Sequence, residues 1–225
     1  MERLPGGSAV MTTRQVILWR HGRTQWNVEG RVQGQSDIPL DEVGKEQARA
    51  AAARLAALRP DRIVSSDLVR AADTARMLGD LTGTEVELDP RLRELNFGER
   101  EGLTWREAWK KFPDGMQAWV EGDETQIPGS ETHRQAGDRF AAALHDLLDD
   151  VPPEGVMVVV AHGAVLRTGA CAFLDIPEAH WGTFGGLGNC AWSVLEESSH
   201  KDWSQWRLTE WNAGTLPEPV LSDDE

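Results

Sequence analysis

This sequence of 225 residues has no long apolar run, no recognisable secretion signal and only two cysteines. No stretch approaches the ~20 consecutive apolar residues that a membrane-spanning helix needs, and residues 1–13 lack the basic-then-apolar pattern of a signal peptide. The two cysteines, Cys171 and Cys190, lie in apolar surroundings and have no metal-ligand spacing. We therefore expect a cytoplasmic protein whose cysteines are reduced core residues.

Positive charge is scarce as well, because 23 Lys and Arg residues face 37 Asp and Glu residues, a net charge of −14. This balance argues against nucleic acid or an anionic membrane surface as a partner. It does not exclude a phosphorylated substrate, since surface charges are screened over ~8 Å at physiological ionic strength. Part of the acidity is also remote from any core, in the tail residues Glu218, Asp223, Asp224 and Glu225.

The composition is that of an ordinary globular domain, with 40% hydrophobic and 27% charged residues. We expect a single domain over residues 14–212, preceded by a disordered N-terminal extension (1–13) and followed by an acidic disordered tail (213–225). Met1 and Met11 are both candidate translation starts.

The hydrophobic pattern predicts an α/β fold. Four short apolar runs predict strands: 15–19, 62–66, 85–88 and 156–161. The strongest is the unbroken run at 156–161, which we expect at the sheet centre. Helical segments follow them: 44–58, 67 onward, 104–112, 130–150 and 165–174. This alternation predicts a parallel sheet, and the alternating segments 189–195 and 204–211 predict an antiparallel hairpin at one edge. We therefore predict a three-layer α/β/α sandwich with a mostly parallel sheet and an antiparallel edge strand. Residues 113–130 are expected to be an irregular lid or specificity insertion.

Chemically reactive residues follow three of the predicted strands. Arg20, His21 and Gly22 come after the first strand, Arg70 lies one turn into the helix after the second, and His162 follows the central strand. Because the carboxyl ends of parallel strands meet at one sheet edge, we expect these side chains to converge. An imidazole can attack phosphorus and a guanidinium can hold phosphate oxygens as a fork, so the set indicates phosphate chemistry. We expect Gly22 to let the backbone N–H beside His21 approach an anion.

Structural roles compete with this interpretation for two of the residues. Arg70 could instead pair with an aspartate of its own helix segment, Asp67 or Asp73. An acid is expected from Glu94, in the loop at 92–99, but Glu99 and Glu101 are alternatives. The remaining histidines are assigned to caps or the surface: His133, His145, His180 and His200. Three tryptophans are candidates for lining a substrate pocket: Trp26, Trp119 and Trp181.

Five segments together resemble the histidine phosphatase superfamily, in the branch that includes the cofactor-dependent phosphoglycerate mutases: 18–27, 34–40, 65–71, 92–98 and 159–163. More narrowly, residues 185–192 and 206–212 resemble actinobacterial glucosyl-3-phosphoglycerate phosphatases.

The resemblance implies a phosphoglycerate mutase-like fold and a role for each candidate residue. His21 would attack phosphorus and become phosphohistidine, while Arg20, Arg70 and His162 would hold the phosphoryl oxygens. Glu94 would protonate the leaving alkoxide and then deprotonate the attacking water. Further substrate contacts are expected from Asn27, Thr24, Gln33 and Gly163. No metal or other cofactor is implied, because arginine forks replace Mg²⁺ as the charge clamp.

Three functions remain open at this stage. The first is a metal-independent phosphatase of small phosphorylated metabolites, with glucosyl-3-phosphoglycerate as a candidate substrate. The second is a mutase, and the third is a phospho-ligand binding module without catalysis. The acid loop at 96–102 favours the phosphatase over the mutase, and a pure binder would not need the nucleophile His21. The edge hairpin invites a homodimer.

Overall fold

The structure, a computed structural model, describes residues 13–198 and 205–214. His200, residues 1–12 of the expected N-terminal extension and residues 215–225 of the expected tail lie outside these ranges. Ala213, where that tail was expected to begin, is the last residue of a strand.

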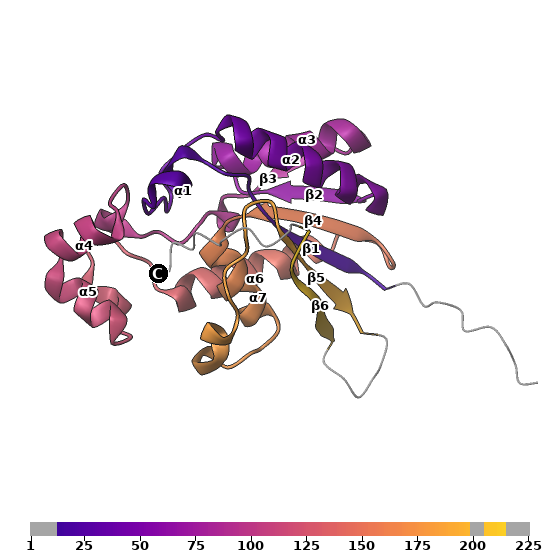
Figure 1. The fold of residues 1–225 in the computed structure, drawn as a ribbon. Coiled ribbons are helices and arrows are strands. Elements are labelled where there is room, and N and C mark those ends of the chain that lie inside the picture. The colour runs from indigo at the N-terminus through magenta and orange to yellow at the C-terminus, as the bar shows by residue number, and fades with distance from the viewer. Residues whose placement is uncertain (1–12, 199–204, 215–225) are drawn as a thin grey trace, which may run out of the picture.

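One mixed sheet forms the middle layer of the described chain (Figure 1). Its strand order is β3-β2-β4-β1-β5-β6, with parallel pairing from β3 to β1 and antiparallel pairing of β5 and β6 at the far side. The predicted sandwich with an antiparallel edge is therefore confirmed. The strands are β1 (Gln15–Arg20), β2 (Arg62–Ser65), β3 (Val86–Leu88), β4 (Val156–Ala161), β5 (Trp192–Glu197) and β6 (Trp206–Ala213).

Helices cover both faces of the sheet. The helices α2 (Glu42–Leu55) and α3 (Val69–Thr82) lie on one face, and α6 (His133–Leu148) and α7 (Gly163–Phe173) lie on the other (Figure 1). Alternate residues of β1 serve the two layers: Ile17 packs with the first pair of helices, and Leu18 with the second. Because both faces of β1 and β4 are buried, both strands read as unbroken apolar runs in the sequence.

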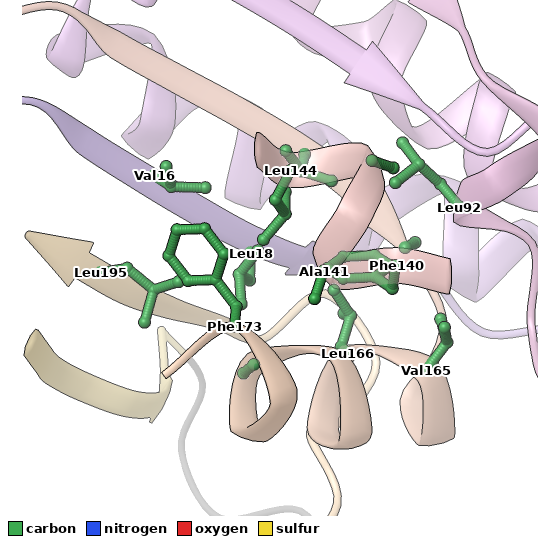
Figure 2. Packing of buried hydrophobic residues seen from close by; sticks show 14 of the residues in the cluster. Val16, Leu18, Leu92, Phe140, Ala141, Leu144, Val165, Leu166, Phe173 and Leu195 are labelled. Carbon is green, nitrogen blue, oxygen red and sulfur yellow. The ribbon is translucent and has the colours of Figure 1, made fainter. Parts of the chain in front are cut away.

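The larger core lies between the sheet and the pair α6 and α7. Phe140 and Leu144 of α6, Leu166 of α7 and Leu18 of β1 all belong to this buried cluster (Figure 2). The two helices approach closely because α7 has Gly169 where it meets α6; a Cβ at this position would lie 2.2 Å from the Phe140 ring.

The helix starts follow from local capping. The Asp41 carboxylate accepts a hydrogen bond from the Gly44 N–H (2.7 Å) and caps α2, as expected for this residue type. The helix α3 begins at Val69 and not at the predicted position 67. Asp67 instead holds Arg93 through two hydrogen bonds, and Leu68 is extended.

The lid segment is more regular than predicted. The helix α4 (Trp105–Lys111) is followed directly by α5 (Pro113–Val120), although we expected an irregular segment from residue 113. Pro113 does not break this helix because it occupies the first turn, where no amide hydrogen is needed. A small core of its own, with Met116 and Ile127 fully buried, holds the lid together.

The remaining elements are short: α1 (Gln25–Glu29) and the 3-10 helices η1 (Ala56–Leu58), η2 (Pro90–Leu92), η3 (Gly98–Arg100), η4 (Glu124–Gln126) and η5 (Glu178–Thr183). Within residues 13–198 and 205–214, none of the helices is both long and apolar enough to span a membrane.

We predict that Gly169→Ala lowers the free energy of unfolding by about 1–3 kcal/mol, because the new methyl group must displace the Phe140 ring or separate α6 from α7. The higher helix propensity of alanine recovers only about 1 kcal/mol. Urea unfolding measures the change. Gly182→Ala is the matched control, since a Cβ at Gly182 meets nothing within 4 Å; equal stability of the two variants would contradict this packing.

Candidate active site

His21 lies at the carboxyl end of β1, where its imidazole is 2% exposed. Its Nδ1 lies 2.7 Å from the carbonyl oxygen of Gly22, which can only accept a hydrogen bond. The proton of the neutral ring is therefore on Nδ1, and Nε2 carries a free lone pair. Burial lowers the pKa of His21 well below 6.5, and the charges of Arg70 and Arg20 lower it further. The ring is thus neutral, with the lone pair of Nε2 available.

Gly22 has a different role from the one expected. Its N–H donates to the hydroxyl of Thr74 (3.1 Å) rather than facing the site, and a Cβ on Gly22 would lie 2.4 Å from the carbonyl oxygen of Gly44. The residue is glycine because the chain crosses the first turn of α2 there. The expectation that this N–H approaches an anion is wrong.

Arg70 reaches the same sheet edge from the first turn of α3, and its side chain is fully buried. Its Nη1 and Nη2 atoms donate to the carbonyl oxygens of Ser36 and Gly34, each at 2.7 Å. The two aspartates considered as alternative partners of Arg70 form ion pairs with other arginines: Asp67 with Arg93, and Asp73 with Arg76. The turn at 34–36 therefore aims the guanidinium.

His162 stands beside His21, with ring centroids 5.1 Å apart. Its Nδ1 accepts a hydrogen bond from Arg70 Nε (3.1 Å), so the ring proton is on Nε2, which donates to Ser66 Oγ (2.8 Å). Burial and the charge of Arg70 lower the pKa of His162 well below 6.5. Our sequence analysis missed Ser66 as a site residue, although it directly follows the strand β2.

Arg20, the last residue of β1, completes the cluster. Its Nη1 donates to the carbonyl oxygen of Leu187, and its Nε is buried without a hydrogen-bond partner among the described residues. Gly163 permits this packing, because a Cβ there would lie 3.3 Å from Arg20 Cζ. Asn189, also missed, donates from Nδ2 to the His21 carbonyl oxygen at 3.2 Å. The loop at 187–190 is thus part of the site.

The structure gives different tasks to the polar residues expected to contact substrate. Thr24 is fully buried and caps α1, and its hydroxyl donates to Gln33 Oε1 (2.9 Å). Asn27 accepts at Oδ1 from the Thr24 N–H (3.1 Å), whereas its Nδ2 is buried and has no partner within the described part of the chain. Asn27 therefore presents a donor to the site, while the hydroxyl of Thr24 is occupied by structural contacts.

Glu94 lies against the amino end of α7 and is 2% exposed. Its Oε1 accepts from the N–H groups of Leu95 (2.9 Å) and Val165 (2.8 Å), and its Oε2 accepts from Ala164 (3.1 Å). These backbone N–H groups at the amino end of α7 fix the position of the Glu94 carboxyl group. Because α7 starts directly after His162, these contacts place Glu94 against the helix turn that follows His162 in the chain.

Two side chains connect the loops that carry these groups. The Glu101 carboxylate accepts from the N–H groups of Gln35 (2.9 Å) and Phe97 (3.3 Å) and from the Ser36 hydroxyl (2.7 Å). It thereby joins the turn that aims Arg70 to the acid loop of Glu94. From the opposite side, Arg139 of α6 donates to the carbonyl oxygens of residues 91, 93 and 94.

The other candidates have structural surroundings. Trp181 is 5% exposed and packs against α6, where a Cβ on Gly137 would lie 2.9 Å from its ring. Trp119 lies in the lid beside His133, with ring centroids 6.4 Å apart. His133 is half-buried and hydrogen-bonded to Glu124. The cap of α6 is Thr132, the residue before it. Among the described residues, no group of three or more His, Cys, Asp and Glu side chains could hold a metal ion.

Comparison with known proteins adds a family and relatives. Residues 16–214 match the family model of the histidine phosphatase superfamily (branch 1). A glucosyl-3-phosphoglycerate phosphatase of Mycobacterium tuberculosis is 39% identical over 90% of this chain and 96% of that protein. A probable phosphoglycerate mutase GpmB of an Enterobacter species is 37% identical, covering 88% of this chain and 89% of the relative. The structure of a mycobacterial glucosyl-3-phosphoglycerate phosphatase in complex with VO3 superposes with a TM-score of 0.81, at 39% identity, over 89% of this chain and all of that one.

The buried imidazoles predict a loss of stability in mild acid. In the unfolded chain both take up a proton near pH 6.5, whereas burial keeps them neutral in the folded protein well below that pH. The unfolded state therefore binds more protons below pH 6.5, and stability falls as the pH decreases, by about 1 kcal/mol per histidine down to pH 5.5.

Urea unfolding at pH 7.5 and pH 5.5 measures this loss, and His21→Ala should reduce it because one of the two imidazoles is gone. Unchanged stability in the parent protein, or an equal loss in His21→Ala, would contradict the buried neutral pair.

Proposed function

Since the chain belongs to branch 1 of the histidine phosphatase superfamily, we propose that it hydrolyses phosphomonoesters of small metabolites through a phosphohistidine at His21, without a metal ion. The observation that carries this proposal is the neutral His21 ring, whose Nδ1 faces the Gly22 carbonyl oxygen and whose Nε2 is free to attack. The phosphatases among the relatives support the same activity.

In the first step His21 Nε2 attacks phosphorus, and the bond from phosphorus to the ester oxygen breaks. The phosphoryl oxygens are bound by Arg20, Arg70 and the Nδ2 donor of Asn27. Two of these buried donors, Arg20 Nε and Asn27 Nδ2, have no other hydrogen-bond partner in the described chain. Preorganised donors of this kind stabilise the charge of the transition state. Glu94 gives its proton to the leaving alkoxide.

In the second step water attacks the phosphohistidine, and the bond between phosphorus and Nε2 breaks. Glu94, now a carboxylate, takes a proton from this water. His21 returns to its neutral form, and inorganic phosphate leaves. The position of Glu94 beside the first residues of α7 suits both proton transfers, since the same helix begins next to His162.

Two guanidiniums supply the charge that a divalent cation supplies in many phosphoryl-transfer enzymes. For this reason the proposed reaction needs no added metal, and EDTA should leave the rate unchanged. The substrate class follows from the relatives, and glucosyl-3-phosphoglycerate is the first compound to test.

A mutase is the second candidate, because some relatives are named probable phosphoglycerate mutases. A mutase returns the phosphoryl group to the substrate instead of to water. Incubation with 3-phosphoglycerate and a bisphosphoglycerate distinguishes the two: release of inorganic phosphate supports the phosphatase, and isomerisation supports the mutase.

We predict that His21→Ala lowers kcat/KM for p-nitrophenyl phosphate by at least about 10³-fold, since the nucleophile is lost. Parent enzyme quenched in alkali, where the phosphorus–nitrogen bond survives, should contain phosphohistidine at His21, detected by ³¹P NMR or mass spectrometry. His180→Ala, which removes an exposed imidazole of η5, is the control and should keep full activity. Turnover by His21→Ala at the parent rate would exclude the mechanism.

A further prediction concerns Glu101, whose carboxylate joins the turn at 34–36 to the acid loop. Glu101→Ala frees both the turn that aims Arg70 and the acid loop, so we expect kcat/KM to fall by roughly 10- to 100-fold while the protein stays folded. Glu99→Ala is the matched control, because Glu99 is an exposed acid of the same loop whose carboxylate pairs with the exposed Lys111. Equal activity of the two variants would show that Glu101 does not position the site.

A further inference from the structure

The peptide group between Gly22 and Arg23 connects the imidazole of His21 to the helix α2. Its carbonyl oxygen, that of Gly22, lies 2.7 Å from His21 Nδ1 and accepts the ring proton. Its N–H, that of Arg23, donates to the side-chain Oε1 of Gln47 at 3.0 Å. Gln47, a half-buried residue of α2, is therefore one peptide group away from the ring that we place at phosphorus.

The first turns of α2 bring Gln47 to this peptide group. Gly44 meets the chain so closely that a Cβ on it would lie 2.7 Å from the backbone nitrogen of Arg23. Gln47 follows Gly44 by three residues and so lies on the same side of the helix. The capping residue Asp41 holds Arg23 twice, by its N–H on the Arg23 carbonyl oxygen (3.0 Å) and by its carboxylate on Arg23 Nε (2.8 Å). Residue 23 is thus fixed to the amino end of α2.

The orientation of the peptide group decides which nitrogen of the His21 ring carries the proton. With the Gly22 carbonyl facing the ring, the proton stays on Nδ1 and Nε2 keeps its lone pair. If the group turned over, its N–H would face Nδ1, the proton would move to Nε2, and the lone pair would be lost for attack. Glycine opposes such a rotation little, because it has no Cβ. An acceptor on the Arg23 N–H is therefore needed to hold the group in place.

The preceding peptide group is held by a separate contact. The Gly22 N–H donates to the Thr74 hydroxyl (3.1 Å), which in turn donates to the carbonyl oxygen of Arg70 (2.7 Å). This contact fixes the amide that joins His21 to Gly22, and it leaves the Gly22 carbonyl to the next peptide group. Hydrogen bonds in series polarise one another, so the acceptor on the Arg23 N–H also strengthens the Gly22 carbonyl as the partner of the imidazole.

We propose that Gln47 is a positioning residue: by accepting the Arg23 N–H, it holds the Gly22 carbonyl against His21 Nδ1 and so keeps Nε2 free to attack phosphorus. This inference rests on the proposed function. It adds to that function a residue that acts through a peptide group of the chain instead of by touching the substrate.

Gln47→Met tests the role, because methionine has a similar length and helix propensity but only a weakly accepting sulfur. We expect kcat/KM for p-nitrophenyl phosphate to fall by about 5- to 100-fold, the range for a peptide N–H left without its hydrogen bond. Inorganic phosphate should inhibit the variant at least as strongly as the parent, since the groups that bind the phosphoryl oxygens are unchanged. Gln47→Glu, which keeps an acceptor at this position, should retain most of the parent activity.

The tautomer of His21 is measured directly by ¹⁵N NMR at pH 7.5 on protein labelled at histidine, with the His21 signals identified by their absence from His21→Ala. In the parent, Nδ1 should have the chemical shift of a protonated nitrogen and Nε2 that of an unprotonated one. In Gln47→Met the two shifts should move in opposite directions, towards the other tautomer, whereas in Gln47→Glu they should keep the parent values.

Glu46→Met is the matched control, since it places the same side chain on the neighbouring, exposed position of α2 and should keep the parent activity and shifts. If circular dichroism shows that Gln47→Met does not fold, Gln47→Leu removes the same acceptor and takes its place. Parent activity and shifts in the variant without the acceptor, or an equal loss in Gln47→Glu, would overturn the role of Gln47.

A failure of the proposed function is a separate outcome. If the parent does not hydrolyse p-nitrophenyl phosphate, the phosphatase is excluded, and the NMR comparison of the parent with Gln47→Met and Gln47→Glu still decides whether Gln47 sets the tautomer of His21.

Discussion

The structure depends on burying two guanidiniums against two imidazoles at one edge of the sheet. Such a group of cations is costly to remove from water unless its donors find partners. Backbone carbonyl groups supply them: those of Gly34 and Ser36 hold Arg70, and that of Leu187 holds Arg20. Burial, together with the positive charges of the arginines, lowers the pKa of both imidazoles and keeps them neutral, the form in which an imidazole can act as a nucleophile.

The fold brings these groups together through its parallel strands, but the loops decide their orientation. Glu101 joins the turn that aims Arg70 to the acid loop, and Arg139 holds the acid loop from α6. Small residues make room where the segments cross, as Gly22 does against α2 and Gly163 against Arg20. Several contacts that look like substrate binding in the sequence are therefore internal supports of the site.

The relatives share this fold and differ in the activities for which they are named, so the fold alone does not determine the substrate. In this chain Arg20, His21 and His162 stand at or directly after strand ends. The proposed chemistry thus depends on short local motifs.

The sequence by itself determined the sheet, the chain order of its strands and the placement of Arg20, His21, Arg70 and His162 at strand ends, because apolar runs and the polar residues that end them are local patterns. Only the tertiary structure decided the tautomer of the imidazole, the loop-to-loop hydrogen bonds and the regular lid helix that starts at Pro113. These features arise from hydrogen bonds and packing between residues distant in sequence, or from a helix whose first turn tolerates proline, and neither leaves a periodic signal.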